Sequence, residues 1–154
     1  MKIQVNVNGI DRELEVSPGT SLNDALRNIL GLTGVKRGCD SGGCGTCTVL
    51  LDGKPVYSCM TPSWKADGRN VLTVEGLEKD GKLHVLQEEF IKNFAPQCGY
   101  CTPAMLMVGK ALLDENPNPS EEEVRLAISG VLCRCTGYLP YIKSIMDASR
   151  LNSK

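Results

Sequence analysis

The sequence is organised around one stretch of nine residues, Cys39-Asp40-Ser41-Gly42-Gly43-Cys44-Gly45-Thr46-Cys47. Four residues separate the first two cysteines of this stretch, and two residues separate the second from the third. A fourth cysteine, Cys59, follows after eleven further residues. The glycines among the sulfurs permit positive φ angles and close approach of the backbone, so that amide groups can point at sulfur. The stretch therefore predicts a loop that wraps tightly around a buried inorganic core.

The cysteine spacing of this loop, C-x4-C-x2-C followed by a distant cysteine, is that of a plant-type [2Fe–2S] site. The loop resembles that of plant-type ferredoxins. A phosphate-binding loop is the alternative for residues 42–45, but the Gly-Lys-Ser/Thr ending is missing, as is the pattern G-x-G-x-x-G. We therefore predict four cluster ligands in this part of the chain: Cys39, Cys44, Cys47 and Cys59.

The bulk composition narrows the class of protein. The chain has 154 residues and a net charge of −1, so neither a nucleic acid nor an anionic membrane is expected as a partner. Its eight cysteines would suggest disulfides in a secreted protein. Residues 1–7 instead enter a strand pattern without an apolar leader segment. We therefore expect a cytoplasmic protein in which clustered cysteines bind metal.

The first half of the chain alternates apolar and polar residues, which is typical of half-buried strands. Asn8-Gly9 and Asp52-Gly53 are strong signals for hairpin turns. Ser21 is a good N-cap for a helix whose apolar residues recur at helical spacing. The predicted elements are a strand at 3–7, a return strand at 14–16, a helix at 22–30, a hairpin at 48–57 and a strand at 71–74.

Strand signals end in residues 75–82, where the composition changes, and helices are predicted beyond. Leu83, Leu86, Phe90 and Phe94 would share one helical face. Further helices are expected from the Thr102-Pro103 cap to about 115, from the Ser120 capping box onward, and from 140 to 150. The fold class is therefore α+β, with a β-grasp ferredoxin domain at 1–76 followed by a four-helix bundle at 77–154. His84, the only histidine, is expected at the surface or at a helix start.

A second set of cysteines lies in the helical half, with the spacing C-x2-C…C-x-C. Cys101 directly precedes a predicted helix start, where free N–H groups and the positive helix end stabilise a thiolate. The spacing alone is ambiguous because structural zinc sites use similar cysteine pairs. Because the chain is already predicted to carry one redox cluster, a second iron–sulfur cluster is favoured over zinc at this site. The predicted ligands are Cys98, Cys101, Cys133 and Cys135.

The flanks of both cysteine sets identify a family. Residues 97–103, read as Gln-Cys-Gly-Tyr-Cys-Thr-Pro, and residues 132–138, read as Leu-Cys-Arg-Cys-Thr-Gly-Tyr, resemble the small iron–sulfur subunit of the xanthine oxidase family of molybdenum hydroxylases. Gly38-Cys39 and residues 44–49 match the first half of the same pattern. The resemblance extends from about residue 3 to residue 150. Three residues depart from the usual pattern, but none of the departures removes a ligand: Gly43, Thr46 and Ala104.

This resemblance implies two [2Fe–2S] clusters and two partner subunits. The cluster between helices would face a molybdenum–pterin cofactor in a large subunit, and the plant-type cluster would face FAD in a medium subunit. A dimer of such heterotrimers is expected. By the same resemblance, Gln97 approaches the pterin, and Cys135 is a cluster ligand that also hydrogen-bonds the pterin edge.

No pattern in the sequence predicts a catalytic site on this chain, since it has no nucleophile with a base and no recognisable pair of carboxylates. All eight cysteines would be ligands of saturated clusters, which exchange single electrons. The predicted function is a relay of electrons from the molybdenum site through both clusters to FAD. Two alternatives remain at this point, a free-standing two-cluster ferredoxin and a zinc-stapled interaction protein.

Overall fold

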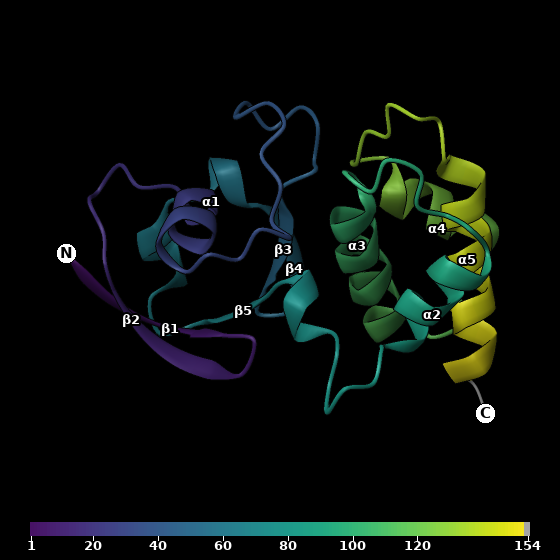
Figure 1. The fold of residues 1–154 in the computed structure, drawn as a ribbon, viewed down its shortest axis with the longest axis horizontal. Helices are drawn as coiled ribbons and strands as arrows, with labels where there is room; N and C mark the ends of the chain where they lie inside the picture. Colours follow the sequence, from purple (N-terminus) through teal and green to yellow (C-terminus); the bar gives the residue numbers. More distant parts are fainter. Residues whose placement is uncertain (153–154) are drawn as a thin grey trace.

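The structure, a computed structural model, describes residues 1–152. Its first half is a mixed β-sheet with short helices, and its second half consists of α-helices that lie beside the sheet (Figure 1). The predicted α+β class is therefore confirmed. The last two residues of the predicted second domain, 153–154, lie outside the described residues. No helix in residues 1–152 is long and apolar enough to cross a membrane.

The sheet has five strands in the order β2-β1-β5-β3-β4. Both predicted hairpins are confirmed, because β1 pairs with β2 and β3 pairs with β4 in antiparallel register. Asn8 and Gly9 have φ angles of 55° and 83°, as a type I′ turn requires. β5 joins the hairpins by pairing parallel to β1 and antiparallel to β3. The strands span Lys2–Val7 (β1), Ile10–Glu15 (β2), Thr48–Leu51 (β3), Lys54–Tyr57 (β4) and Asn70–Leu72 (β5).

One helical segment packs on this sheet, where a helix was predicted at 22–30. It begins as α1, Leu22–Asp24, capped by Ser21, whose hydroxyl accepts from the Asp24 amide at 3.0 Å. It continues as a π-helical segment, Ala25–Ile29, in which the Leu30 amide donates to the Ala25 carbonyl. Leu22, Ala25 and Leu26 are buried with the alternating residues of β1 in one core cluster, whereas Ile29 is 48% exposed. Residues 30–38 then connect this segment to the first cysteine loop.

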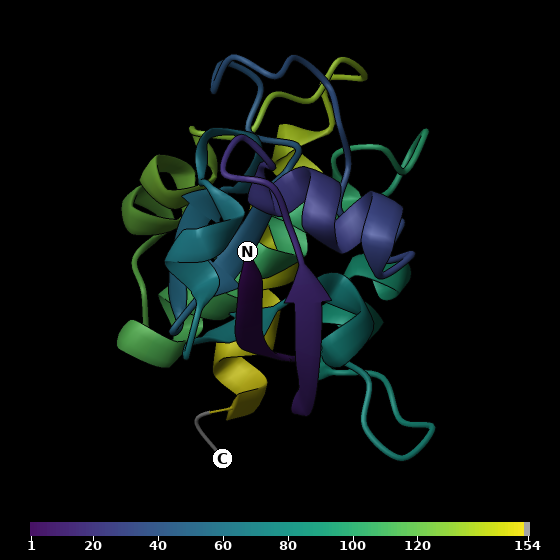
Figure 2. The ribbon, with the colours of Figure 1, turned by 90° about the vertical axis from the view of Figure 1, so that its left-hand side faces the viewer.

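Four helices form the second half: α2, Val85–Lys92; α3, Thr102–Glu115; α4, Glu121–Ile128; and α5, Tyr138–Asn152. Helix α3 contacts β3 on one side and the other helices on the other (Figures 1 and 2). Phe90 and Tyr141 pack at the centre of the helical core, with ring centroids 5.2 Å apart. Leu50 of β3 belongs to the same core cluster. β3 therefore contributes to the core of the helices as well as to that of the sheet.

Two of the predicted helix starts are confirmed, whereas the last helix, predicted from 140, begins at Tyr138. Ser120 makes the full capping box of α4, and His84 is the N-cap of α2, where its Nδ1 accepts from the Leu86 amide at 3.2 Å. At α3 the prediction is wrong, because Cys101 occupies the N-cap position and Thr102 is the first helical residue.

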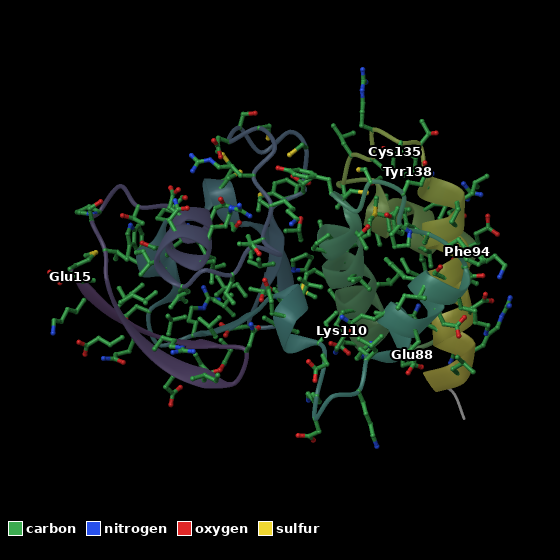
Figure 3. The ribbon with its side chains drawn as sticks, viewed as in Figure 1. Glu15, Glu88, Phe94, Lys110, Cys135 and Tyr138 are labelled. Carbon is green, nitrogen blue, oxygen red and sulfur yellow. The ribbon has the colours of Figure 1, made fainter. Side chains whose placement is uncertain are left out.

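The predicted apolar face of α2 is wrong at both ends. The helix covers Val85–Lys92 only, so that Leu83 and Phe94 lie outside it. Phe94 is 85% exposed and has a φ of 52°. Its amide still donates to the Ile91 carbonyl, so the chain turns out of the helix at this residue. The turn carries the Phe94 side chain to the outer surface of the helices (Figure 3).

Candidate metal centres

The first cysteine loop connects the π-helical segment to β3 and runs over the end of the sheet (Figure 1). Asp40, Gly42 and Gly45 all have positive φ angles, so the backbone curls around the sulfurs as the glycine content predicts. The amides of Ser41 and Cys44 both donate to Cys39 Sγ, at N–S distances of 3.4 Å. The loop thus presents backbone donors to sulfur.

Hydrogen-bond donors and burial shift the pKa values of two thiols of the first set in opposite directions. The Ser41 amide, with help from Cys44, lowers the pKa of the Cys39 thiol to about 6. Burial, together with the neighbouring Cys47 thiol, raises the pKa of Cys59 to about 11. An exposed thiol stabilised as an anion thus lies beside one that is partly shielded from water. Negative charge in this loop is stabilised mainly by amide groups, as a cluster with four thiolates needs.

The four thiols of the first set are arranged as two pairs. The Cys44 group helps to lower the pKa of Cys39, and the Cys47 thiol helps to raise that of Cys59, so each of these thiols lies beside a second cysteine. Each iron of a [2Fe–2S] cluster takes two of the four thiolates, so this arrangement fits the cluster. Within residues 1–152, no three His, Cys, Asp or Glu side chains meet at a position for a single metal ion.

A buried network of hydrogen bonds connects the first cysteine loop to α1, and sequence reasoning missed it. Asn23 of α1 is 1% exposed, and its amide donates to the Lys36 carbonyl at 3.0 Å and to Ser58 Oγ at 3.1 Å. The Ser58 hydroxyl in turn donates to the Cys47 carbonyl at 2.7 Å. The only sequence signal was a polar residue among the apolar positions of α1. The network ties both ends of the loop to the residue before Cys59.

The second set of cysteines lies in two loops of the helical half. Cys98 and Cys101 precede α3, whereas Cys133 and Cys135 lie between α4 and α5. These thiols also form pairs. The Tyr100 amide and then the Cys135 thiol lower the pKa of Cys98. Burial raises the pKa of Cys101 to about 11, and its neighbour there is the Cys133 thiol. The second set therefore offers the same two-by-two arrangement.

Two tyrosines of α5 hold this second set in place. Tyr141 is 1% exposed, and its hydroxyl lies 3.5 Å from Cys101 Sγ and 2.8 Å from Thr102 Oγ1. Burial, the largest cause, raises the pKa of Tyr141, so its hydroxyl stays protonated. The Tyr138 hydroxyl accepts from the Cys133 amide at 2.8 Å. The spacing of these tyrosines, one helical turn apart, was the available signal for their shared role.

The two predicted pterin-facing residues lie close to each other. A Cβ atom added to Gly137 would be 3.3 Å from Gln97 Nε2, so Gln97 lies against the loop that carries Cys135. Gln97 and Cys98 are exposed, and Cys135 is half-buried. Figure 3 shows Cys135 at the same end of the molecule as the first cysteine loop. These residues form one accessible edge of the second set.

A cavity of about 480 Å³ joins the two sets. Cys44 and Thr46 line it from the first loop, and three cysteines line it from the second set. All eight cysteines are free thiols. The two candidate centres are thus neighbours within one region.

Comparisons with known proteins agree with this geometry. Residues 5–73 match the family model of the 2Fe-2S iron-sulfur cluster binding domain, and residues 73–146 match that of the [2Fe-2S] binding domain. The nicotinate dehydrogenase small FeS subunit of Eubacterium barkeri is 49% identical over 137 residues, which cover 89% of this chain and 87% of the relative.

Two further relatives carry the comparison across the full chain. The xanthine dehydrogenase iron-sulfur-binding subunit of Escherichia coli O157:H7 is 40% identical over 153 residues, covering 96% of this chain and 94% of the relative. A chain in the crystal structure of quinoline 2-oxidoreductase from Pseudomonas putida 86 superposes with a TM-score of 0.95 at 47% identity, covering 99% of this chain and 94% of that one. The chain, with its two [2Fe–2S]-binding domains, therefore belongs to the small iron–sulfur subunits of the xanthine oxidase family of molybdenum hydroxylases.

Proposed function

We propose that this chain holds two [2Fe–2S] clusters in a molybdenum hydroxylase and relays single electrons from a molybdenum–pterin site to FAD. The observation that carries the proposal is the pairing of the eight thiols, two by two, in two adjacent sets. When bound, the clusters supply one-electron exchange. The proposed ligands are Cys39, Cys44, Cys47 and Cys59 for one cluster and Cys98, Cys101, Cys133 and Cys135 for the other.

The chain's own residues position the sulfurs and stabilise their charge. Backbone amides point at Cys39, and the Gly137 amide donates to Cys133 Sγ at 3.3 Å. Cys101 is the N-cap of α3, where the helix dipole favours an anion and opposes the burial that raises the pKa of this thiol. Hydrogen bonds to sulfur and burial are the means by which a protein sets a cluster potential. The different burial of the two sets supports different potentials for the two centres.

The exposed ends of the two sets suggest where partner subunits bind. The edge formed by Gln97, Cys98 and Cys135 would face the pterin in a large subunit, and the exposed Cys39 would face FAD in a medium subunit. We further propose a dimer of such heterotrimers in the cytoplasm. The finer description of the fold remains our proposal as well, a β-grasp ferredoxin domain at 1–76 and a four-helix bundle at 77–154.

The ligand assignment is tested with two matched variants of the native complex, Cys39→Ser and Cys135→Ser. The wild type should contain about four irons per chain and show two distinct EPR signals of reduced [2Fe–2S] clusters. Each variant should alter or lose one signal and retain the other, and the affected signal should differ between the two. Colourless protein with bound zinc, or a single EPR signal in the wild type, would contradict the proposal.

Size-exclusion chromatography of native material tests the partnership. We expect the chain to elute with two larger subunits. A lone particle near 16.7 kDa that is competent as an electron carrier would instead support a free-standing ferredoxin. The charge balance favours the complex, because a mobile carrier would be expected to present a docking face of one sign, and this chain has a net charge of −1.

A further inference from the structure

The two cysteine loops touch through their backbones at one place. The Leu132 amide donates to the Cys44 carbonyl at 2.8 Å, which links a residue of the first set to the neighbour of Cys133. Gly45 follows Cys44, is buried and has a φ of 68°. A Cβ atom at Gly45 would lie 1.9 Å from the carbonyl oxygen of Gly130. We call this contact between residues 44–45 and 130–132 the seam.

Two tyrosine hydroxyls make further hydrogen bonds between the two halves of the molecule, one of them to a residue of the seam. Tyr57 of β4, two residues before Cys59, donates to the Gly130 carbonyl at 2.9 Å. Tyr100, which directly precedes Cys101, donates to the Arg37 carbonyl at 2.6 Å. Each bond joins a residue beside one cysteine set to the other half of the molecule. The hydrogen bonds between the two halves are therefore made by residues that lie close in sequence to the cysteines.

A side chain at Gly45 would displace the backbone that faces it. Ordinary contact for a Cβ atom begins at about 3.4 Å, whereas the available distance at Gly45 is 1.9 Å. The obstacle is a backbone carbonyl rather than a flexible side chain, so it has no rotamer that could move aside. A methyl group at Gly45 would therefore push residues 130–132 away by more than an ångström and break the hydrogen bond between Leu132 and Cys44.

We propose that Gly45 is a positioning residue whose missing side chain fixes the distance between the two cysteine sets. This inference rests on the proposed ligand assignment, because it concerns the separation of the two clusters. Electron tunnelling and magnetic coupling between two centres both fall steeply with distance. A seam closed at backbone contact keeps that distance short and constant, and the two tyrosine hydroxyls hold it closed.

The test compares Gly45→Ala with Gly53→Ala in the holoenzyme. Gly53 is a matched control, since it also has a positive φ, 79°, but an added Cβ would meet nothing within 4 Å. Both variants strain the backbone of the first half, and only the first opens the seam. The readouts are iron content, the EPR spectrum of each reduced cluster, and the spin–spin coupling when both clusters are reduced.

We expect Gly45→Ala to retain both EPR signals and to lose much of the coupling, while Gly53→Ala keeps the wild-type coupling. Equal coupling in the two variants would overturn the seam inference and leave the ligand assignment intact. A wild type with one signal would overturn the assignment itself. If Gly45→Ala does not assemble, Tyr57→Phe removes one hydroxyl only, and it should weaken the coupling. Unchanged coupling in Tyr57→Phe would then overturn the inference.

Discussion

Replacing Tyr141 with phenylalanine should lower the reduction potential of the cluster bound by the second cysteine set. The Cys101 thiol donates to the Tyr141 hydroxyl at 3.5 Å. A thiolate ligand has no proton, so in the loaded protein the hydroxyl must donate to sulfur and accept from Thr102. Tyr141→Phe removes this donor and little else, because the ring remains packed against Phe90.

The expected size follows from the geometry. A net hydrogen bond to a charged group contributes about 1.5–3 kcal/mol, and 3.5 Å is a long donor–acceptor distance. The bond stabilises the reduced cluster more, because reduction adds one negative charge. A difference of about 1 kcal/mol between the two oxidation states corresponds to about 40 mV for one electron. The potential should therefore become more negative by about this amount.

The assay is a redox titration of the holoenzyme followed by EPR, in which the two signals report on each cluster separately. Tyr57→Phe is the matched control, since its hydroxyl bonds the Gly130 carbonyl and not a sulfur. Only the second-set signal should shift in Tyr141→Phe, and neither potential should shift in the control. An unshifted second-set potential, or equal shifts of both signals, would refute the argument that this hydroxyl acts on Cys101.

Three further predictions concern stability and are measured by urea unfolding of the cluster-free chain. Ser120→Ala should lower the free energy of unfolding by about 1 kcal/mol, because it removes the capping box shared with Glu123; an unchanged midpoint would contradict this. Asn23→Ala should cost about 2 kcal/mol, since it removes the buried hydrogen bonds to the Lys36 carbonyl and to Ser58 Oγ; a loss no larger than that of an exposed asparagine would speak against the network. Burial, followed by the charge of Lys110, lowers the pKa of His84, so its stabilising contribution is complete above the unfolded pKa of about 6.5 and is lost as the pH falls through the lowered folded value. Asparagine can cap a helix but does not titrate, so His84→Asn should not lose this stability at acid pH. Identical plots of unfolding free energy against pH for the variant and the wild type would refute the role of His84.

Local signals predicted most of the backbone. The turn at Asn8-Gly9 and the cap at Ser120 are short-range patterns whose physical causes act within four residues, and both are confirmed. The two iron–sulfur domains were equally predictable, because ligand spacing is constrained by cluster chemistry, while the individual ligands stay a prediction. Phe94 was predicted to share the apolar face of α2 because its spacing continued that stripe. The helix ends two residues earlier, and periodicity alone does not locate that end.

The features that organise the site come from contacts between distant parts of the chain. The approach of Gly45 to Gly130 joins residues 85 positions apart, and nothing local to either glycine indicates its partner. Asn23 likewise gains its role only when Ser58 is placed beside it. Such pairings depend on how the sheet and the helices pack, which a single sequence does not encode in any short window.

The strand β3 has consequences for how this chain can be divided. All four of its residues are buried, with Leu50 in the helical core and Val49 and Leu51 in the core of the sheet. A fragment that ended at residue 76 would expose the helix-facing side of this strand to water and invite aggregation. Because β3 contributes to both cores, the stability of the sheet and that of the helices depend on each other.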